Sequence, residues 1–357
     1  MRTARVTVDE LARIAPAQLE GAVLLAPLKL PSGALAKGVR FDAATATRVV
    51  AAAKAGDLAR PARLAWPDPD DVHEDEAARR LALAVAGGGV EPRAPRQSRL
   101  DLAASRDGVL HVRTESLRRI NAIDPLEVFT LFDGQAVPGG QVVCSVKVAP
   151  HLVPAAAVAA GVRIAREEGP VVEVWPYRAH EVAAIAVEAM SPEALARFEA
   201  GARSKLDALG SRFGGTTVVP DDDPEPAAAA IGAALDEVVG RRGLAVVLVG
   251  GVSAGDPLSP FWMALEARGG AVVRRGVPAH PGSMIWLARL GRTQLLGLPS
   301  CGMFSLATAA DLVLPRLLTG EELTAERLAD LGHGGVLTRD MRFRFPAYAR
   351  DLGAPEG

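Results

Sequence analysis

The chain has 357 residues, of which 49% are hydrophobic and 23% charged, and this composition excludes a disordered or fibrous protein. Its 40 lysines and arginines nearly balance its 42 aspartates and glutamates, for a net charge of -2. That balance excludes the broad basic surface that non-specific binding to nucleic acid or to an anionic bilayer requires.

Residues 1–95 are predicted to form a smaller α+β region. It combines apolar, strand-like runs with helices that begin at capping residues and end at glycines. The predicted elements are a strand over 22–30, a helix over 43–55 capped by Asp42, an exposed acidic loop over 67–76 and a helix that ends at Ala86. The glycines at 87–89 form a candidate hinge.

Residues 96–177 are predicted to form a β-rich region. Short runs of alternating apolar residues, separated by glycine turns, indicate strands. The runs lie at 100–102, 109–112, 128–132 and 142–148, with helices over 114–122 and 155–168 and a strand over 171–175. This region also precedes the larger domain.

Residues 178–320 alternate strand-like runs with segments of helical length. Parallel strands need crossover connections, so the alternation predicts a three-layer, doubly wound α/β domain with a mostly parallel sheet. The expected strands lie over 182–187, 216–219, 244–249, 271–277, 284–290 and 295–298. Residues 321–357 are expected to form a C-terminal tail. Ligands of such sheets bind at the carboxyl ends of the strands, so the turns there are the candidates for function.

The cysteines and the apolar stretches indicate the cellular compartment in which the protein is expected. Cys144 and Cys301 are too few for a disulfide framework and have no zinc-binding spacing, so we expect a reducing compartment, the cytoplasm. The most apolar stretch, 152–164, contains Pro154 and is shorter than the ~20 residues that a membrane span needs. We therefore expect no membrane segment.

Four turns that follow the predicted strands are rich in glycine, proline and aspartate. They lie at 219–225, 250–257, 278–282 and 297–302. Glycines let a backbone approach a phosphate closely, and helix N-termini offer amide donors, so these turns suit an anionic ligand. The predicted ligand-binding residues are Gly250, Gly251, Ser253, Gly255, His280, Pro281, Gly282, Pro299 and Ser300.

Asp221 and Asp256 are the candidate catalytic and metal-binding residues. Their carboxylates, together with that of Asp222, could hold a Mg²⁺ ion that bridges an anionic ligand to the protein. Structural alternatives stay open for several positions. They are a helix N-cap at Asp223-Pro224, a tight turn at Gly250-Gly251, a cap at Asp256, a loop histidine at His280 and a buried thiol at Cys301.

The segment Gly251-Val252-Ser253-Ala254-Gly255 also matches G-x-S-x-G, the nucleophile elbow of the α/β-hydrolases. With Asp311 and His333 it predicts, as an alternative, a serine hydrolase that uses Ser253. The elbow serine stands at the start of its helix, whereas Pro257 and Pro260 break any helix that begins at Ala254. Ser259-Pro260 is the better helix start, which argues against the hydrolase.

At these turns the second half of the chain resembles the molybdopterin-binding domain of the MoeA and MogA type proteins of molybdenum-cofactor biosynthesis. The matching segments occur in order, as Val219-Pro220-Asp221-Asp222, then 248–256, then 276–282, then Gly297-Leu298-Pro299-Ser300. In the first half, Gly21–Ala26, Leu30–Gly33 and Lys37-Gly38 resemble the N-terminal part of bacterial MoeA-like proteins.

Some positions depart from the MoeA pattern. The first strand ends at Ala186 without Thr-Gly-Asp-Glu, Leu258 stands where a second acid is expected, His280 replaces a lysine, and Ser300-Cys301 replaces Gly-Asn. Only a short segment follows Leu318, so we expect no counterpart of the C-terminal β-barrel of MoeA.

The resemblance implies that the ligand is molybdopterin or its nucleotide form and that the protein serves molybdenum cofactor biosynthesis or delivery. The positions matching Asp221 and Asp256 would support Mg²⁺-dependent adenylylation or the insertion of molybdate, a molybdenumtransferase-like reaction. The alternative is a non-catalytic carrier, or an interaction scaffold, whose partner is a client molybdoenzyme or another cofactor-synthesis protein. The resemblance also implies that the protein is a homodimer. We expect it to bind neither nucleic acid nor a membrane.

Overall fold

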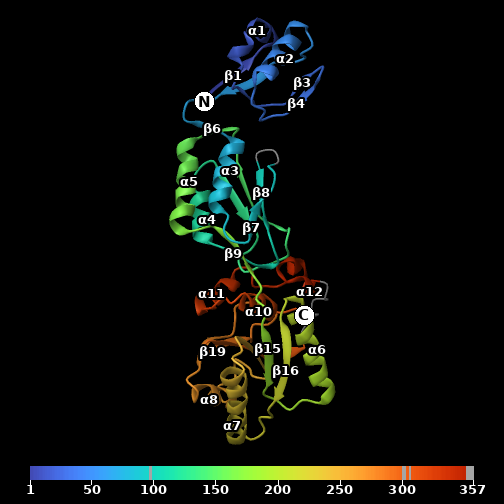
Figure 1. Ribbon diagram of the computed structural model, residues 1–357, viewed down its shortest axis with the longest axis vertical. Coiled ribbons are helices and arrows are strands. Elements are labelled where there is room, and N and C mark those ends of the chain that lie inside the picture. Colours follow the sequence, from blue (N-terminus) through green and yellow to red (C-terminus); the bar gives the residue numbers. More distant parts are fainter. Residues whose placement is uncertain (96–98, 300–302, 305–306, 351–357) are drawn as a thin grey trace. The chain divides into compact units, whose positions relative to one another are not determined.

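The computed structural model describes residues 1–95, 99–299, 303–304 and 307–350, and the chain divides into two compact units (Figure 1). The first unit comprises residues 1–105, 111–133 and 139–174. The second comprises residues 106–110, 134–138 and the chain from Trp175 onward. Across the described residues, none of the helices has the length and apolar character that crossing a bilayer demands.

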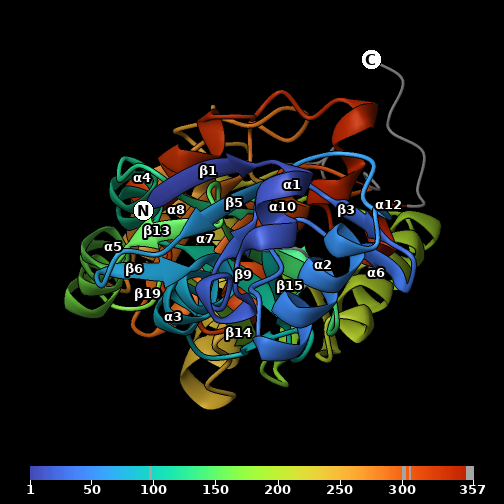
Figure 2. The same cartoon turned by 90° about the horizontal axis from the view of Figure 1, so that it is seen from above.

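The N-terminal part of the first unit is a three-stranded sheet, order β1-β5-β2, packed against α1 and α2 (Figures 1 and 2). The elements are β1 (Arg2–Val6), α1 (Val8–Arg13), β2 (Val23–Leu24), β3 (Leu28–Leu30), β4 (Gly33–Leu35), α2 (Ala43–Lys54) and β5 (Ala62–Trp66). The predicted helix is confirmed, and Asp42 Oδ1 caps it by accepting from Thr45 N at 2.7 Å. The strand expected over 22–30 is divided into two, because Pro27 has no N–H to continue a ladder.

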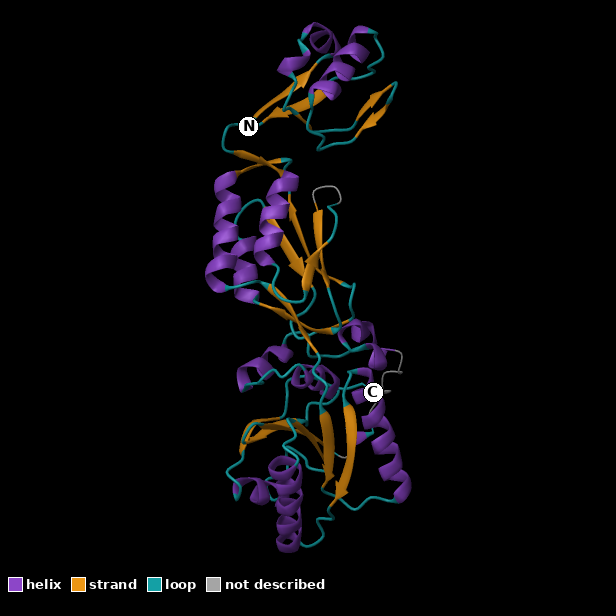
Figure 3. Ribbon diagram, viewed as in Figure 1, coloured by secondary structure: helices purple, strands orange, loops and turns teal. Residues whose placement is uncertain are grey.

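The rest of the first unit is an antiparallel sheet, order β10-β12-β8-β7, packed with helices α3, α4 and α5 (Figure 3). The elements are β6 (Asp71–His73), α3 (Glu74–Val85), β7 (Val90–Pro92), β8 (Arg99–Ala104), α4 (Thr114–Asn121), β10 (Leu126–Thr130), β12 (Val142–Val148), β13 (Leu152–Pro154) and α5 (Ala155–Glu168). Two further strands, β9 (Gly108–Val112) and β14 (Val172–Pro176), have residues in both units. The acidic loop expected over 67–76 contains β6, which pairs with β13.

The glycines at 87–89 make close contacts within the first unit and do not form a hinge. Gly89 has a φ of +75°, and a Cβ there would collide with the carbonyl oxygen of Val174. A Cβ on Gly87 would lie 2.7 Å from the Pro170 side chain. Glycine is required at position 89 because the Val174 backbone lies against it, whereas the neighbours of Gly87 are side chains.

Cys144 lies in β12 and is 1% exposed, whereas Cys301 is outside the described residues. Burial, and to a smaller extent the charge of Asp101, raises the pKa of the Cys144 thiol to about 12. The thiolate is the reactive form of cysteine, so we expect Cys144 to resist alkylation at pH 8 in the folded protein. In a Cys301→Ser variant, iodoacetamide should modify no thiol until denaturant is added. Alkylation of the native variant at the rate of free cysteine would contradict this expectation.

The second unit is built on a six-stranded sheet, order β16-β15-β17-β20-β19-β18. The strands are β15 (Glu181–Ala186), β16 (Arg212–Val218), β17 (Val246–Gly250), β18 (Ala271–Arg275), β19 (Trp286–Leu290) and β20 (Thr293–Leu298), and β11 is Ala136–Val137. The four strands β16, β15, β17 and β20, in this order across the sheet, pair in parallel. Strand β19 is antiparallel to both of its neighbours, β20 and β18. The predicted α/β class and its mostly parallel sheet are confirmed.

Helices lie on both faces of this sheet, because alternate residues of each strand point to opposite sides. In β15, residues 182, 184 and 186 join the apolar cluster of α6 and α10, whereas 183 and 185 join that of α7 and α8. The helices are α6 (Pro192–Ala208), α7 (Pro224–Leu235), with a π-helical continuation over Asp236–Arg241, α8 (Pro260–Glu266) and α10 (Ala310–Leu318).

The segment after α10, expected as a tail over 321–357, contributes to the core of the second unit as far as it is described. It contains α11 (Ala325–Ala329), 3₁₀ turns over Asp330–Gly332 and Arg339–Arg344, and α12 (Ala347–Arg350). Its residues Leu323, Leu328, Leu331 and Phe345 are buried in the cluster of α6 and α10. These apolar residues are too widely spaced to form a continuous helical or strand-like pattern, and the sequence signal for this packing is therefore weak.

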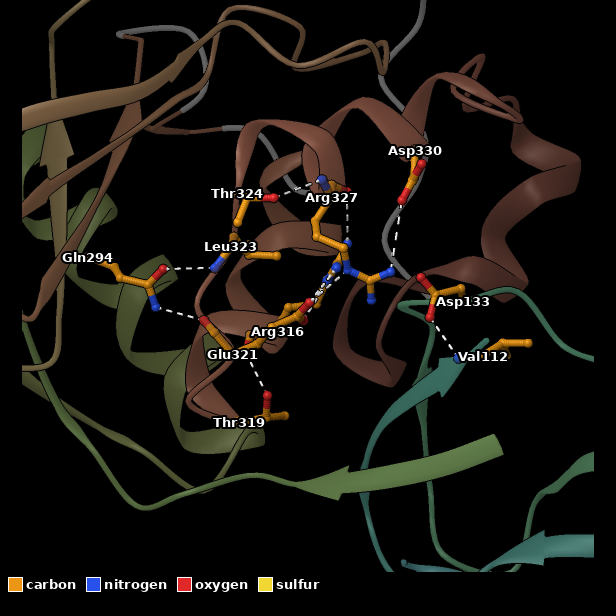
Figure 4. A network of polar contacts seen from close by, with 10 residues as sticks. All are labelled: Val112, Asp133, Gln294, Arg316, Thr319, Glu321, Leu323, Thr324, Arg327 and Asp330. Carbon is orange, nitrogen blue, oxygen red and sulfur yellow. Dashed lines mark hydrogen bonds and ion pairs between the residues drawn. The ribbon is translucent and has the colours of Figure 1, made fainter. Parts of the chain in front are cut away.

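A buried ion pair holds the beginning of this segment (Figure 4). Arg316 donates from Nε and Nη2 to the carboxylate of Glu321 at 2.8 and 2.6 Å, and the two residues are 2% and 6% exposed. Gln294 of β20 donates from Nε2 to the Glu321 carbonyl at 2.8 Å, and its Oε1 accepts from Leu323 N at 3.3 Å. Polar contacts therefore tie the segment to the central strands.

Candidate functional site

The predicted turns lie at one edge of the six-stranded sheet. Because β15, β16, β17 and β20 are parallel, the chain leaves all four at the same edge. β19 is antiparallel to β20 and β18, so the connection between β18 and β19, residues 276–285, lies there as well. The edge therefore joins segments that are more than eighty residues apart in sequence, as the topological prediction requires.

The two glycines that follow β17 have packing reasons for their identity. Gly251 has a φ of +83°, its N–H donates to Leu298 O at 3.0 Å, and a Cβ there would lie 2.8 Å from Val187 O. A Cβ on Gly250 would lie 2.6 Å from the Met303 sulfur. The tight-turn interpretation, one of the two left open by the sequence, therefore accounts for Gly251, whereas Gly250 ends β17 and faces the flexible end of the Met303 side chain.

The remainder of this turn combines internal hydrogen bonds with unused amides. Ser253 Oγ accepts from Gly255 N at 3.2 Å, and Asp256 Oδ1 accepts from Leu258 N at 3.0 Å. Ser253 is half-buried and Asp256 is exposed. Within the described residues, the backbone N–H groups of Val252, Ser253 and Ala254 have no acceptor. Ser253 and Ala254 are partly exposed, whereas Val252 is 1% exposed, so the amides of Ser253 and Ala254 are the better placed for a ligand.

The side chains of two buried tryptophans donate hydrogen bonds to the backbone of the turn that follows β17. Trp286 Nε1 donates to Val252 O at 2.9 Å, and Trp262 Nε1 donates to Asp256 O at 2.8 Å. The rings lie against each other, with centroids 4.7 Å apart, and Trp286 is fully buried. These two bonds fix the carbonyl oxygens of Val252 and Asp256, one near each end of the turn.

The geometry contradicts the serine hydrolase. Helix α8 begins at Pro260 with Ser259 as its N-cap, so Ser253 does not stand at the start of a helix as an elbow serine does. The Asp311 carboxylate accepts from Thr308 N at 2.9 Å and from Tyr348 OH at 3.0 Å, and pairs with Lys205 at 2.8 Å. His333 is exposed, and the described residues contain no serine–histidine–aspartate chain of hydrogen bonds. The triad predicted from Ser253, Asp311 and His333 is therefore wrong.

The aspartates that follow β16 are exposed. Asp223 is the N-cap of α7, with Pro224 at the first helical position, although its side chain makes no capping hydrogen bond. Asp221 follows β16 and Asp256 follows β17, and β15 lies between these strands, so two strand spacings, about 10 Å, separate their positions across the sheet. Among the described residues no three His, Cys, Asp or Glu side chains lie close enough to hold a metal ion.

This geometry does not by itself form a Mg²⁺ site. Mg²⁺ demands six oxygen ligands in a near-octahedral arrangement, and the two exposed aspartates supply a fraction of them from different strands. Asp221 and Asp256 could reach such an ion only through oxygens of a bound ligand and water. We therefore assign no chemical step to the metal.

The turn between β18 and β19 is held on two sides. His280 N donates to Gly335 O at 2.7 Å and His280 O accepts from Leu337 N at 2.8 Å, so its backbone pairs with the C-terminal segment while its side chain is exposed. Gly282 has a φ of +103°, and a Cβ there would lie 2.7 Å from Ala309 N. Pro281 O accepts from Ala309 N at 2.9 Å.

The last predicted turn is described only in part. Pro299 is buried at the end of β20, and Ser300 and Cys301 lie outside the described residues. Gly255, in the preceding turn, is exposed, and a Cβ there would lie 3.2 Å from Met284 Cε. Of the predicted ligand-binding residues that the structure describes, Gly255 and His280 are exposed, and Gly251, Ser253, Pro281 and Gly282 are partly exposed.

The structure also contains a cavity of about 280 Å³ next to this edge, which the sequence analysis did not predict. It lies between α6, α10 and the face of the sheet, and Leu298 and Met303 line it at the end nearest the turns. The sequence signal was the spacing of Arg197, Gly201 and Lys205, which places two cations and a gap on one face of α6. Such a spacing is equally typical of a solvent-exposed helix face.

No family model and no curated protein matches the chain. Solved structures that match include the molybdopterin biosynthesis enzyme MoaB from Thermus thermophilus, with 20% identity, a TM-score of 0.29, and coverage of 40% of this chain and 98% of that one. The molybdopterin biosynthesis protein MoeA from Pyrococcus horikoshii has 16% identity, a TM-score of 0.27, and coverage of 70% and 79%. MogA has 16% identity, a TM-score of 0.25, and coverage of 39% and 92%. Identities and TM-scores of this size do not assign the chain to a family.

Proposed function

We propose that this protein binds molybdopterin or its nucleotide form at the carboxyl edge of the six-stranded sheet, in the biosynthesis or delivery of the molybdenum cofactor. The observation that carries the proposal is the run of backbone N–H groups at Val252, Ser253 and Ala254 that have no acceptor among the described residues. Successive N–H groups form a concave site for an anion, and molybdopterin has a terminal phosphate. The ordered turn sequences that resemble the MoeA and MogA type proteins indicate which phosphate ligand to expect.

The chain's near-neutral charge agrees with this mode of binding. A net charge of -2 supplies no general attraction for anions, so the affinity must come from local groups. Trp286 and Trp262 donate to the carbonyl oxygens of Val252 and Asp256 and so fix the backbone of the turn before the ligand arrives, and donors that are already oriented lose little entropy on binding. In this proposal Gly282 and His280 border the same anion site from the neighbouring turn.

A carrier role has one observation in its favour. Asp256 Oδ1 is used within the turn by Leu258 N. A molybdenumtransferase-like role would require Asp221 and Asp256 to orient molybdate or a metal ion on the bound ligand. We propose the carrier as the second candidate function. For the enzyme and the carrier alike, we propose that the protein is a homodimer.

The pterin itself is the first test. Protein purified from a molybdenum-replete host should release a pterin that fluoresces after oxidation. An Ala254→Pro variant lacks one of the three amides and should retain about tenfold less pterin, because a hydrogen bond to a charged group contributes roughly 1.5–3 kcal/mol. Ala254→Ser keeps the amide and serves as the matched control. Absence of pterin from the wild type, even when molybdopterin is supplied, would overturn the proposed function.

Asp256→Ala separates the enzyme from the carrier. Because amides and not carboxylates hold the phosphate in this proposal, the variant should bind pterin as the wild type does. An enzyme would consume molybdate or the ATP-activated cofactor in a Mg²⁺-dependent reaction, and Asp256→Ala would abolish that turnover. A carrier would release the cofactor unaltered in both forms of the protein, which mass spectrometry of the released pterin would show.

A further inference from the structure

The cavity between α6 and α10 is distinct from the amide site. Its floor consists of Leu248, Leu296 and Leu298 from the central strands, and Phe198, Met303 and Leu314 form its walls. Its volume of about 280 Å³ is close to the lower limit, roughly 300 Å³, of small-molecule sites. It belongs entirely to the second unit. An apolar hollow of this size in a close-packed domain leaves its lining without packing partners unless a ligand enters.

The polar groups of the cavity are few and are placed at different depths. Arg197 is exposed, and its guanidinium lies 5.4 Å from the centroid of the Phe304 ring. Lys205 lies deeper and pairs with the buried Asp311 carboxylate at 2.8 Å, where Asp311 also accepts from Thr308 N and Tyr348 OH. The Lys205–Asp311 pair is therefore neutral as a whole. Arg197 is the cation of the cavity rim that lies outside this pair, and Glu193, one helical turn earlier on α6, is the acid near it.

We propose that this cavity is a second binding site, for a small apolar molecule that carries one carboxylate. The apolar part would fill the space above the leucines, and the carboxylate would bind Arg197 at the rim. An engineered apolar cavity of about 150 Å³ binds one benzene ring, so a cavity about twice that size suits two fused rings. The occupant has the size of a bicyclic aromatic acid.

The pterin of the proposed function does not fit this chemistry. A pterin ring has hydrogen-bonding groups around its edge, and most of the lining consists of leucine, phenylalanine and methionine side chains, while Lys205 and Asp311 are already paired with each other. Burying a polar group without a partner costs about 1–3 kcal/mol on protein mutational scales, and several would be buried at once. The cavity thus selects a different ligand from the amide site, and the two proposals fail independently.

Gly201 offers a way to close the cavity without disturbing the fold. It lies on the exposed face of α6 and lines the cavity, and nothing lies within 4 Å of the position that a Cβ would take. Gly201→Phe should place a ring in the cavity mouth while the helix is kept. Gly201→Ala adds a methyl group alone and is the matched control.

The test uses 2-naphthoate as the probe, titrated into the full-length protein in a calorimeter, with the neutral 2-naphthamide for comparison. The wild type should bind one 2-naphthoate per chain, and Gly201→Phe should abolish that binding while Gly201→Ala keeps it. Arg197→Met should weaken 2-naphthoate about tenfold, the effect of losing a charge-assisted hydrogen bond, and should leave 2-naphthamide unchanged. Pterin retention should be the same in all of these variants.

Three results would overturn the proposal: no saturable binding of 2-naphthoate to the wild type, binding that survives Gly201→Phe, or equal affinities of the wild type for 2-naphthoate and 2-naphthamide. Thermal unfolding of each variant establishes that it is folded. A protein that binds 2-naphthoate but never pterin would remove the proposed function alone. A protein that retains pterin but shows any of these three results would remove the cavity proposal alone.

Discussion

Glu321→Gln should lower the free energy of unfolding by about 3–5 kcal/mol, because it leaves the Arg316 guanidinium buried without its anion. Arg316 is 2% exposed and donates two hydrogen bonds to the Glu321 carboxylate. For a unit of this size, such a change corresponds to a fall in the melting temperature of roughly 10 °C. Denaturant unfolding of the purified variant measures it directly.

The neighbouring residue provides the control. Glu322 is exposed and lies 3.5 Å from Arg289, and a surface pair of this kind contributes about 0–1 kcal/mol, so Glu322→Gln should be nearly neutral. A double variant, Arg316→Met with Glu321→Leu, replaces both charges and should recover most of the lost stability. Equal effects of Glu321→Gln and Glu322→Gln would show that the ion pair does not hold the C-terminal segment.

Gly297→Ala should both destabilise the second unit and weaken ligand binding. Gly297 lies in β20, and a Cβ there would collide with the fully buried Trp286 ring. Forcing the ring aside costs about 1–3 kcal/mol for overpacking, and the Trp286 Nε1 bond to Val252 O, worth about 1 kcal/mol, would be strained. Because Val252 begins the run of available amides, pterin retention should fall with stability.

A second substitution separates these two effects. Trp286→Phe keeps most of the packing and removes the N–H donor, so it should lower pterin retention more than stability. Gly201→Ala, on an exposed helix face, should leave retention unchanged and raise stability by up to about 1 kcal/mol. Unaltered pterin retention in a folded Gly297→Ala protein would show that the Trp286 contact does not position the turn.

The elements of the second unit were predictable because each one leaves a local signal. Strands such as β15 and β17 are short apolar runs, and the helices between them begin at recognisable positions such as Ser259-Pro260 and Asp223-Pro224. In the first unit, Pro27 marks the break after β2, although the apolar run around it predicts a single strand. The contribution of residues 321–350 to the core was missed, since widely spaced leucines have no periodicity.

The candidate site was predictable in place but not in detail. Glycine-rich turns after parallel strands must meet at one edge, and they do. The role of individual residues depends on contacts between distant segments, as Gly251 against Val187 and Gly282 against Ala309 show. A local sequence pattern does not distinguish a glycine that accommodates a neighbouring backbone from a glycine that accommodates a ligand.

By itself, the sequence of this protein determined the α/β alternation, the order of the turns and a near-neutral charge that leaves anion binding to local groups. These properties follow from the period of apolar residues and from glycine and proline, which act over a few residues. Only the tertiary structure decided that three amides of one turn have no acceptor among the described residues, that the predicted triad does not form there, and that a cavity lies between α6 and α10. Each of these depends on how side chains from remote segments fill the same space.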